Sequence, residues 1–332
     1  MFRHAVYGAR VEGVLEVLAR RVASGSRPGE RDDGYRVALS IEGGGMRGTV
    51  SAGMALALHE LGMVPAFDAV YGASAGAITG AWLLSSRPEG LRGWADPDYA
   101  RTLIRWSALL RGRPVVDVRT LVEVVYQTEF PMDFESILAS AVEYHPLGTD
   151  ARTGESTDLR PLIADPAELR LALRASASLP FLAGPAVELR GRRFYDAGVA
   201  ESVPFRTPIA QRATHVLVLR SRRSRGGVAS ATSGQVNGSP VPPPPRPPRS
   251  VRLLTRTTLR NESLELRTAL LTRGARTAAD VARIAEMEVS GMARTVFPLA
   301  STPPVSRLTT DGALLAAAFE SGRQAARAVL SR

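Results

Sequence analysis

Hydrophobic positions along the chain form short continuous runs that alternate with helical spacings. The run at 35–41 enters a row of glycines, and apolar residues then recur at helical spacing over 47–61, with Gly62 as the expected C-cap. The stretch "FDAVYGASAG" at 67–76 repeats this order, and the helical pattern "AITGAWLL" follows its small-residue turn. Two successive strand–turn–helix units predict an α/β fold with a mostly parallel central sheet and helices on its faces.

The rest of the chain shows a mixed pattern that predicts further elements. Val11, Val14, Leu15 and Leu18 share one face of an N-terminal amphipathic helix. Further helices are expected at 96–110, 117–126, 166–179, 260–295 and 311–330, and strands at 141–157 (with a hairpin-type turn), 192–205 (entering a glycine turn) and 214–221.

Composition changes abruptly at 221–250, which is rich in Gly, Ser, Pro and Arg and has no apolar periodicity. This composition predicts a flexible, partly polyproline loop. Such a run can also bind an SH3-type domain, although a disordered insertion is the simpler interpretation. The expected organisation is an N-terminal helical segment (1–34), a core (35–220), the loop (221–250) and a C-terminal helical part of the same domain (251–332).

Composition and charge narrow the class of protein. The chain has 332 residues and no cysteine, which excludes disulfides and thiolate metal sites. Its net charge of +10 comes from arginine alone, and the arginines are scattered, so we expect no nucleic-acid partner but leave peripheral contact with an anionic membrane open. The N-terminus lacks a signal-peptide core and no apolar run could span a bilayer, so we expect a soluble, cytoplasmic protein.

Two glycine-rich turns carry the candidate chemistry. "GASAG" at 72–76 places Ser74 between a predicted strand and a predicted helix, as in a nucleophile elbow, although a helix cap is the structural alternative. "EGGGMRG" at 42–48 precedes a predicted helix, and its glycines have no side chains to shield their backbone amides. Such amides at a helix N-terminus can stabilise an oxyanion. The motif lacks the ending of a P-loop. The expected donors are the amides of Gly43, Gly44, Gly45 and Ala75, with Arg47 anchoring the loop or meeting a phosphate.

A serine nucleophile needs a base. Asp196, in "FYDAG", ends an apolar strand inside a glycine turn, where functional residues of α/β sheets gather; an Asx-turn is the structural alternative. Of the four histidines, only His215 follows in the order Ser–Asp–His of α/β-hydrolases, but it opens a predicted strand. A Ser74–Asp196–His215 triad therefore stays open.

Together these motifs resemble the patatin-like phospholipase family over about 36–220. "EGGGMRG" is similar to its oxyanion motif, "GASAG" to its nucleophile motif, "DAG" at 196–198 to its aspartate motif, and "ASASLPF" at 175–181 to the segment before it. The resemblance implies a three-layer α/β/α fold and a dyad, with Ser74 as nucleophile, Asp196 as general base, and Gly43, Gly44, Gly45 and Arg47 at the oxyanion site. Ala197 departs from the usual glycine and would be strained if its φ were positive.

The family implies a lipid acyl hydrolase of the phospholipase A, lysophospholipase or acylglycerol lipase type, which acts through an acyl-enzyme without a cofactor or metal. The apolar segments 81–84, 103–110 and 121–126 could line an acyl channel, although ordinary core is the simpler interpretation. Three alternatives stay open: a triad esterase, a non-catalytic docking protein and a transacylase.

Overall fold

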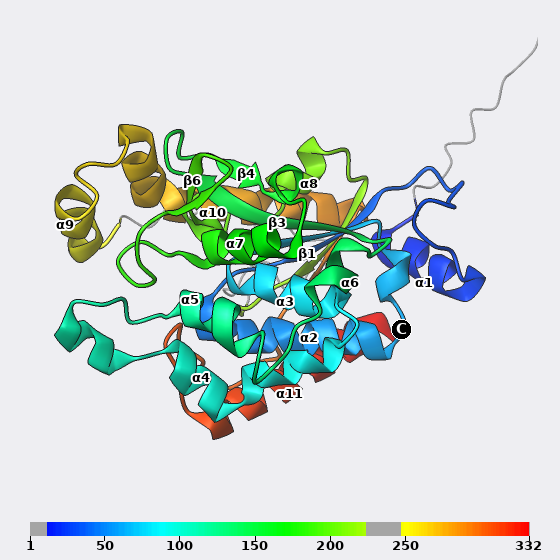
Figure 1. Ribbon diagram of the computed structural model, residues 1–332. Coiled ribbons are helices and arrows are strands. Elements are labelled where there is room, and N and C mark those ends of the chain that lie inside the picture. The colour runs from blue at the N-terminus through cyan, green and yellow to red at the C-terminus, as the bar shows by residue number, and fades with distance from the viewer. Residues whose placement is uncertain (1–11, 224–246, 332) are drawn as a thin grey trace, which may run out of the picture.

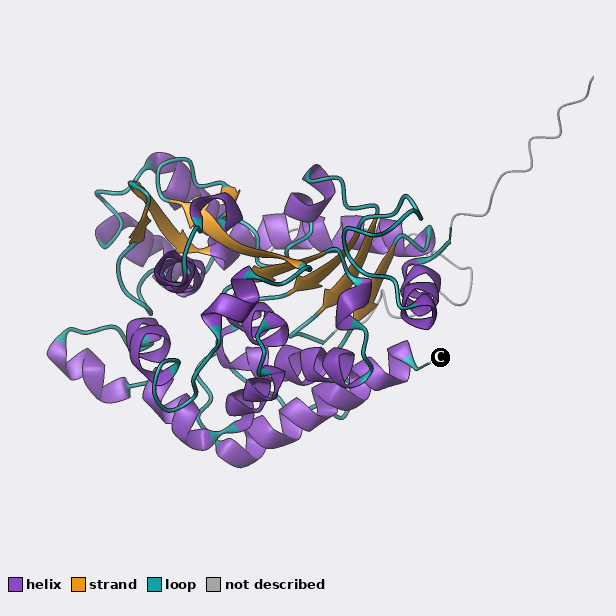
Figure 2. Ribbon diagram, turned by 45° about the vertical axis from the view of Figure 1, so that its right-hand side comes forward, coloured by secondary structure: helices purple, strands orange, loops and turns teal. Residues whose placement is uncertain are grey.

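The computed structural model describes residues 12–223 and 247–331 (Figures 1 and 2). Within them, eight strands form one sheet in the order β5-β6-β3-β2-β1-β7-β8, with β4 paired to β3. The strands from β3 to β8 in this order are parallel, whereas β4, β5 and β6 run antiparallel to their neighbours. Their bounds are β1 (Val37–Ile41), β2 (Ala69–Ala73), β3 (Glu143–Asp150), β4 (Ser156–Asp158), β5 (Val187–Leu189), β6 (Arg192–Asp196), β7 (His215–Leu219) and β8 (Ala293–Val296).

Helices cover both faces of this sheet. Helices α2, α3 and α11 lie below it in Figure 1, and α8 and α10 lie above it. The predicted α/β fold with a mostly parallel sheet is therefore confirmed. The helices are α1 (Val14–Ser24), α2 (Gly48–Glu60), α3 (Ala75–Leu84), α4 (Pro97–Leu103), α5 (Val118–Thr120), α6 (Phe134–Leu138), α7 (Pro166–Ala177), α8 (Arg206–Ala210), α9 (Arg249–Thr257), α10 (Leu264–Val289) and α11 (Gly312–Leu330).

Most predicted elements are confirmed, and three differ. The helix expected at 96–110 ends at Leu103, because Ile104 forms an isolated antiparallel bridge with Val116. The one expected at 117–126 is α5 followed by a π-helical turn, Leu121–Val125. The helices expected over 260–295 end earlier, because 293–296 forms the parallel edge strand β8 beside β7. Of the predicted 221–250 loop, 224–246 lie outside the described residues.

Helix α2 is the centre of the lower layer, and nearly all its residues are buried between the sheet and α11. The two helices cross closely: a Cβ atom on Gly53 would lie 2.0 Å from the carbonyl oxygen of Phe319, and one on Gly322 would lie 2.1 Å from that of Val50. Because α2 starts where the glycine-rich loop ends, this packing fixes the helix N-terminus that faces the site.

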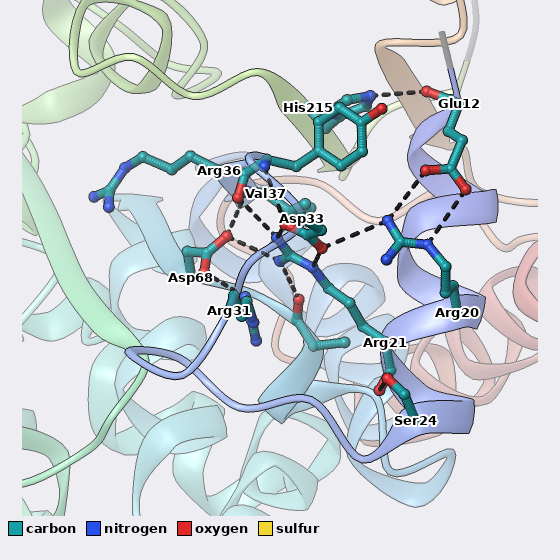
Figure 3. Close-up of polar contacts among 12 residues, drawn as sticks. Glu12, Arg20, Arg21, Ser24, Arg31, Asp33, Arg36, Val37, Asp68 and His215 are labelled. Atoms are coloured by element: carbon teal, nitrogen blue, oxygen red, sulfur yellow. Dashed lines mark hydrogen bonds and ion pairs between the residues drawn. The ribbon is translucent and has the colours of Figure 1, made fainter. Parts of the chain in front are cut away.

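Helix α1 is held at the amino-terminal end of the sheet by one buried arginine (Figure 3). Arg21 is 1% exposed and donates to both carboxylate oxygens of Asp33 and to Asp68, which directly precedes β2. Asp68 also accepts the backbone N–H of Val37 at 2.7 Å, so the same ion-pair network ties α1 to the start of β1. The Arg21 hydrogen bond lowers the pKa of Asp33 to about 2. No described helix is both long and apolar enough to cross a membrane.

Candidate active site

Ser74 sits at a sharp turn between β2 and α3, at the carboxyl end of the parallel strands. Its backbone has φ 55° and ψ −123°, a conformation that is uncommon for a residue with a side chain and typical of a strained elbow. Its N–H donates to the hydroxyl of Ser176 on α7 at 3.0 Å. A Cβ atom on Gly76 would lie 2.2 Å from the carbonyl oxygen of Ile41, so the last position of the G-x-S-x-G motif has no room for a side chain.

The strand register brings Asp196 level with Ser74. In the pairing of β2 with β3, Ala73 lies opposite Leu147, and in the pairing of β3 with β6, Gly148 lies opposite Asp196. Ser74 and Asp196 therefore flank β3 at the same height, and both line the same cavity.

The Asp196 carboxylate is buried, with the residue 3% exposed, and its Oδ1 accepts the N–H of Gly198 at 2.7 Å. Burial raises its pKa above the usual value, while the nearby charge of Arg273 and the nearby Ser74 side chain oppose this rise. A raised pKa makes the carboxylate a stronger base than a free aspartate. Ala197 begins a 3₁₀ turn and does not have a positive φ, so the expected strain at this position is absent.

The glycine-rich loop packs directly on the elbow, because a Cβ atom on Gly43 would lie 2.5 Å from the carbonyl oxygen of Ala73. The Gly43 N–H donates to the Ser202 carbonyl at 3.0 Å, so in this structure Gly43 holds the loop and does not offer the free amide expected of it. Among the described residues, the N–H groups of Gly44 and Gly45 have no acceptor. The amides of Gly44, Gly45 and Ala75, the last at the start of α3, therefore stay the expected oxyanion donors.

Charged groups surround this loop. Glu42 is fully buried, and its Oε2 accepts from Arg220 Nε at 3.0 Å and from the Ser221 N–H at 2.8 Å, which ties the ends of β1 and β7 together. The Nε and Nη2 atoms of Arg47 are buried and have no hydrogen-bond partner among the described residues. Arg47 therefore does not anchor the loop through these two atoms.

Ser74 and Asp196 open into an apolar cavity of about 60 Å³. Gly45 and Arg307 also line it, and its apolar wall includes Met46, Ile78, Trp94, Leu103, Ile104 and Val118. Of the three segments considered for an acyl channel, 103–110 contributes Leu103 and Ile104 to this wall. Residues 81–84 and most of 121–126 are buried in the core away from the cavity.

The histidines lie elsewhere in the described chain. His215 begins β7 and pairs with Val37 at the start of β1, so it is at the opposite end of the sheet from Ser74. Its Nε2 contacts the carbonyl oxygen of Glu12 at 2.9 Å (Figure 3). The triad alternative does not fit this geometry. His145 contacts Asp158, His59 is exposed on α2, and His4 lies outside the described residues.

Three residues near the site have no counterpart in the sequence prediction. Ser176 lies in the quoted stretch "ASASLPF", but no pattern assigns its hydroxyl to the Ser74 N–H. Arg273 on α10 and Arg307 before α11 reach the site only through the tertiary fold. Over the described ranges, no group of three or more His, Asp or Glu residues could hold a metal ion.

Comparisons with known proteins show the family to which the chain belongs. The family model described as patatin-like phospholipase matches residues 39–209, which contain the glycine-rich loop, Ser74 and Asp196. Two similar proteins are an uncharacterized NTE family protein of Mycobacterium bovis and one of Mycobacterium tuberculosis, each 30% identical over 204 residues. The aligned part is 58% of this chain and 48% of each relative, so the chain spans about half the length of the relatives it matches. Because the family model covers more than half of the sequence and its motifs converge in one site, the chain belongs to the patatin-like phospholipase family.

Proposed function

We propose that the protein is a lipid acyl hydrolase that cleaves carboxylic esters through a Ser74–Asp196 dyad. The observation that carries this proposal is that a strained serine and a buried carboxylate of raised pKa line the same apolar cavity. Burial supplies the basicity that a free aspartate lacks at neutral pH. Family membership supports the lipid class of substrate.

In the first half-reaction, Ser74 Oγ attacks the ester carbonyl carbon while Asp196 accepts the hydroxyl proton. The carbonyl oxygen becomes an oxyanion, and the amides of Gly44, Gly45 and Ala75 are the proposed donors to it. Collapse of the intermediate releases the alcohol, which takes the proton from Asp196. In the second half, Asp196 accepts a proton from water while the water oxygen attacks the acyl carbon. Ser74 Oγ then leaves and takes the proton back from Asp196, which releases the fatty acid.

The acyl chain would lie in the apolar cavity. Its volume of about 60 Å³ holds only about two water molecules, so a long chain requires the wall to open. Part of that wall comes from the arm formed by 104–116. Its base is closed by the Ile104–Val116 bridge, and both bridge residues line the cavity.

The tip of this arm supports contact with an anionic membrane. Trp106 is 58% exposed and Leu110 is 92% exposed, and exposed arginines flank them, including Arg105 and Arg111. Apolar side chains among arginines suit a lipid interface, where each cation near an anionic surface contributes about 1 kcal/mol. Helix α9 extends on the same side of Figure 1 and exposes Leu253. We propose that the arm docks on the bilayer and that its base opens the cavity to a lipid.

Release of fatty acid from phospholipid vesicles tests the function. The expected result is turnover by the wild type and by His215→Gln, and none by Ser74→Ala or Asp196→Asn. Loss of turnover in His215→Gln with its fold intact would contradict the dyad. Turnover by Ser74→Ala would contradict the assigned nucleophile. Vesicle binding that persists without any hydrolysis by the wild type would favour a docking protein, and acyl transfer to an added alcohol in place of water would favour a transacylase.

A further inference from the structure

Arg273, on the long helix α10, lies beside the carboxylate of Asp196. The position that a Cβ atom on Gly198 would occupy is 2.8 Å from Asp196 Oδ1 and 3.1 Å from Arg273 Nη2. Two groups of opposite charge therefore face each other across a point that stays vacant because residue 198 is a glycine. Arg307 lines the catalytic cavity, whereas Arg273 is not part of its wall. Arg273 therefore adjoins the base rather than the space for the ester.

Hydrogen bonds hold α10 against the turn that follows Asp196. The Thr277 hydroxyl donates to the carbonyl oxygen of Arg273 at 3.0 Å, and its oxygen lies 3.1 Å from the hydroxyl of Ser202, just beyond that turn. At the start of the helix, the Ser263 hydroxyl donates at 2.8 Å to a backbone carbonyl in the turn after β3. The helix is thus fixed on both sides of Arg273, and the place of the guanidinium beside the carboxylate is a feature of the fold.

The two charged groups are neighbours without forming an ion pair. Within 12–223 and 247–331, the Arg273 side chain makes no hydrogen bond or ion pair, unlike Arg220, whose Nε donates to Glu42 Oε2 at 3.0 Å. The Asp196 carboxylate accepts the N–H of Gly198 instead. A guanidinium bonded directly to the carboxylate would occupy lone pairs that a general base needs for the incoming proton. At a short separation, Arg273 acts through its charge alone.

Burial and the charge of Arg273 act on Asp196 in opposite directions. Burial raises the pKa of Asp196, and Arg273 has the largest opposing effect, followed by the Ser74 side chain, the Gly198 N–H and the charge of Arg307. Burial lowers the pKa of Arg273 itself to about 10, so its guanidinium stays charged at neutral pH. A general base must be ionised before it can accept a proton. The group that offsets burial therefore decides whether Asp196 is active at neutral pH.

We propose that Arg273 is a positioning residue that keeps Asp196 ionised at neutral pH and favours return of its proton in each half-reaction. This rests on the proposed acyl hydrolase function. When Asp196 takes the proton of the Ser74 hydroxyl, the charge of Arg273 loses its counterion. Transfer of that proton to the oxygen of the leaving alcohol restores the pair of opposite charges, and the proton leaves on the released alcohol. Arg273 lies outside the residues 39–209 matched by the family model.

The test is the pH dependence of kcat/KM for para-nitrophenyl butyrate, a small uncharged ester that is soluble in water. Arg273→Gln removes the charge, and Arg273→Lys keeps it. The matched control is Arg283→Gln, which changes an exposed arginine farther along α10. Circular dichroism and the Tm verify that each variant is folded.

In the wild type, kcat/KM should fall at low pH as Asp196 becomes protonated. Arg273→Gln should move this fall to higher pH by at least about one pH unit, because a nearby opposite charge lowers a carboxyl pKa by about 1–3. Its activity should therefore recover when the pH is raised to 9. A misplaced catalytic group would instead lower the rate at every pH. Arg283→Gln should keep the wild-type profile, and Arg273→Lys should lie closer to it than Arg273→Gln.

Two results would overturn the proposal. The first is an Arg273→Gln profile that coincides with the wild type or is lowered equally at every pH. The second is an Arg273→Lys profile shifted as far as that of Arg273→Gln, because the retained charge would then have no effect.

A direct titration makes the outcome independent of turnover. Carbon-13 NMR of the full chain with labelled aspartate follows the carboxyl signal that is missing in Asp196→Asn, and its midpoint should be higher in Arg273→Gln than in the wild type. If the wild type hydrolyses no ester but the midpoint moves, the proposed function fails and the effect of Arg273 on Asp196 stands. An unchanged midpoint overturns that effect whatever the activity.

Discussion

Substitution of Ser176 by alanine removes the hydrogen-bond acceptor of the Ser74 backbone N–H. Ser176 is fully buried on α7, and its hydroxyl accepts the Ser74 N–H at 3.0 Å. Alanine would leave that N–H buried without an acceptor, which costs about 1–3 kcal/mol of unfolding free energy. Ser74 also has a strained backbone conformation that costs about 1–3 kcal/mol and persists only while the surrounding residues hold it in place.

The elbow should relax in this variant and turnover should fall with it. If the misplacement raises the activation barrier by about 1.4 kcal/mol, kcat decreases about tenfold. Two measurements check the reasoning: the unfolding free energy from urea denaturation, and kcat on a water-soluble ester. Both should decrease in Ser176→Ala.

The matched control is Ser178→Ala, two residues along the same stretch. Ser178 is also buried, and its backbone carbonyl accepts the Asp196 N–H, but its side chain makes no hydrogen bond among the described residues. Its substitution removes no side-chain hydrogen bond, so Ser178→Ala should destabilise the protein less than Ser176→Ala does. If the two variants are indistinguishable in both stability and kcat, the Ser176 hydroxyl does not position the nucleophile.

Four further predictions follow from the site and its surroundings. Asp196→Asn should abolish turnover yet unfold at the same or a higher urea concentration at pH 7, because a raised pKa means that the ionised carboxylate disfavours the folded state; marked destabilisation would contradict this assignment. For the same reason, wild-type kcat/KM should fall as the pH drops through a value above that of free aspartate. Trp106→Ser combined with Leu110→Ser should weaken binding to anionic vesicles about tenfold, measured by flotation, and unchanged binding would remove the arm from the interface. Gly76→Ala should fail to give a stable protein by circular dichroism, since its Cβ would overlap the Ile41 carbonyl; a variant with wild-type Tm would show that the elbow is less tightly packed.

The parts of the fold that could be predicted are those determined locally. The order of strand, glycine turn and helix around 35–61 and 67–84 is present in neighbouring residues, and both units are confirmed by β1–α2 and β2–α3. Strand β8 was missed because it has only four residues directly after a long helix, and its place is set by pairing with β7. The arm at 104–116 was missed because a bridge between two distant residues ends α4.

The candidate site, like the fold, is predictable only where local sequence motifs determine it. Ser74 and Asp196 could be proposed from their turns, but their common height depends on the register of β3 with β2 and β6, which no local pattern encodes. Gly43 was expected to offer a free amide, and a contact with Ser202 engages it instead. Arg273 and Arg307 carry no motif, so only the tertiary structure reveals that they reach Asp196.

Covalent labelling tests the central claim most directly. The full chain is incubated with a fluorophosphonate ester probe, and the modified peptide is identified by mass spectrometry in the wild type, Ser74→Ala and Asp196→Asn. A single adduct on Ser74 is expected, absent in Ser74→Ala and formed far more slowly in Asp196→Asn, because the hydroxyl then lacks a base. An adduct on another serine, or labelling of Ser74 at the wild-type rate in Asp196→Asn, would contradict the dyad.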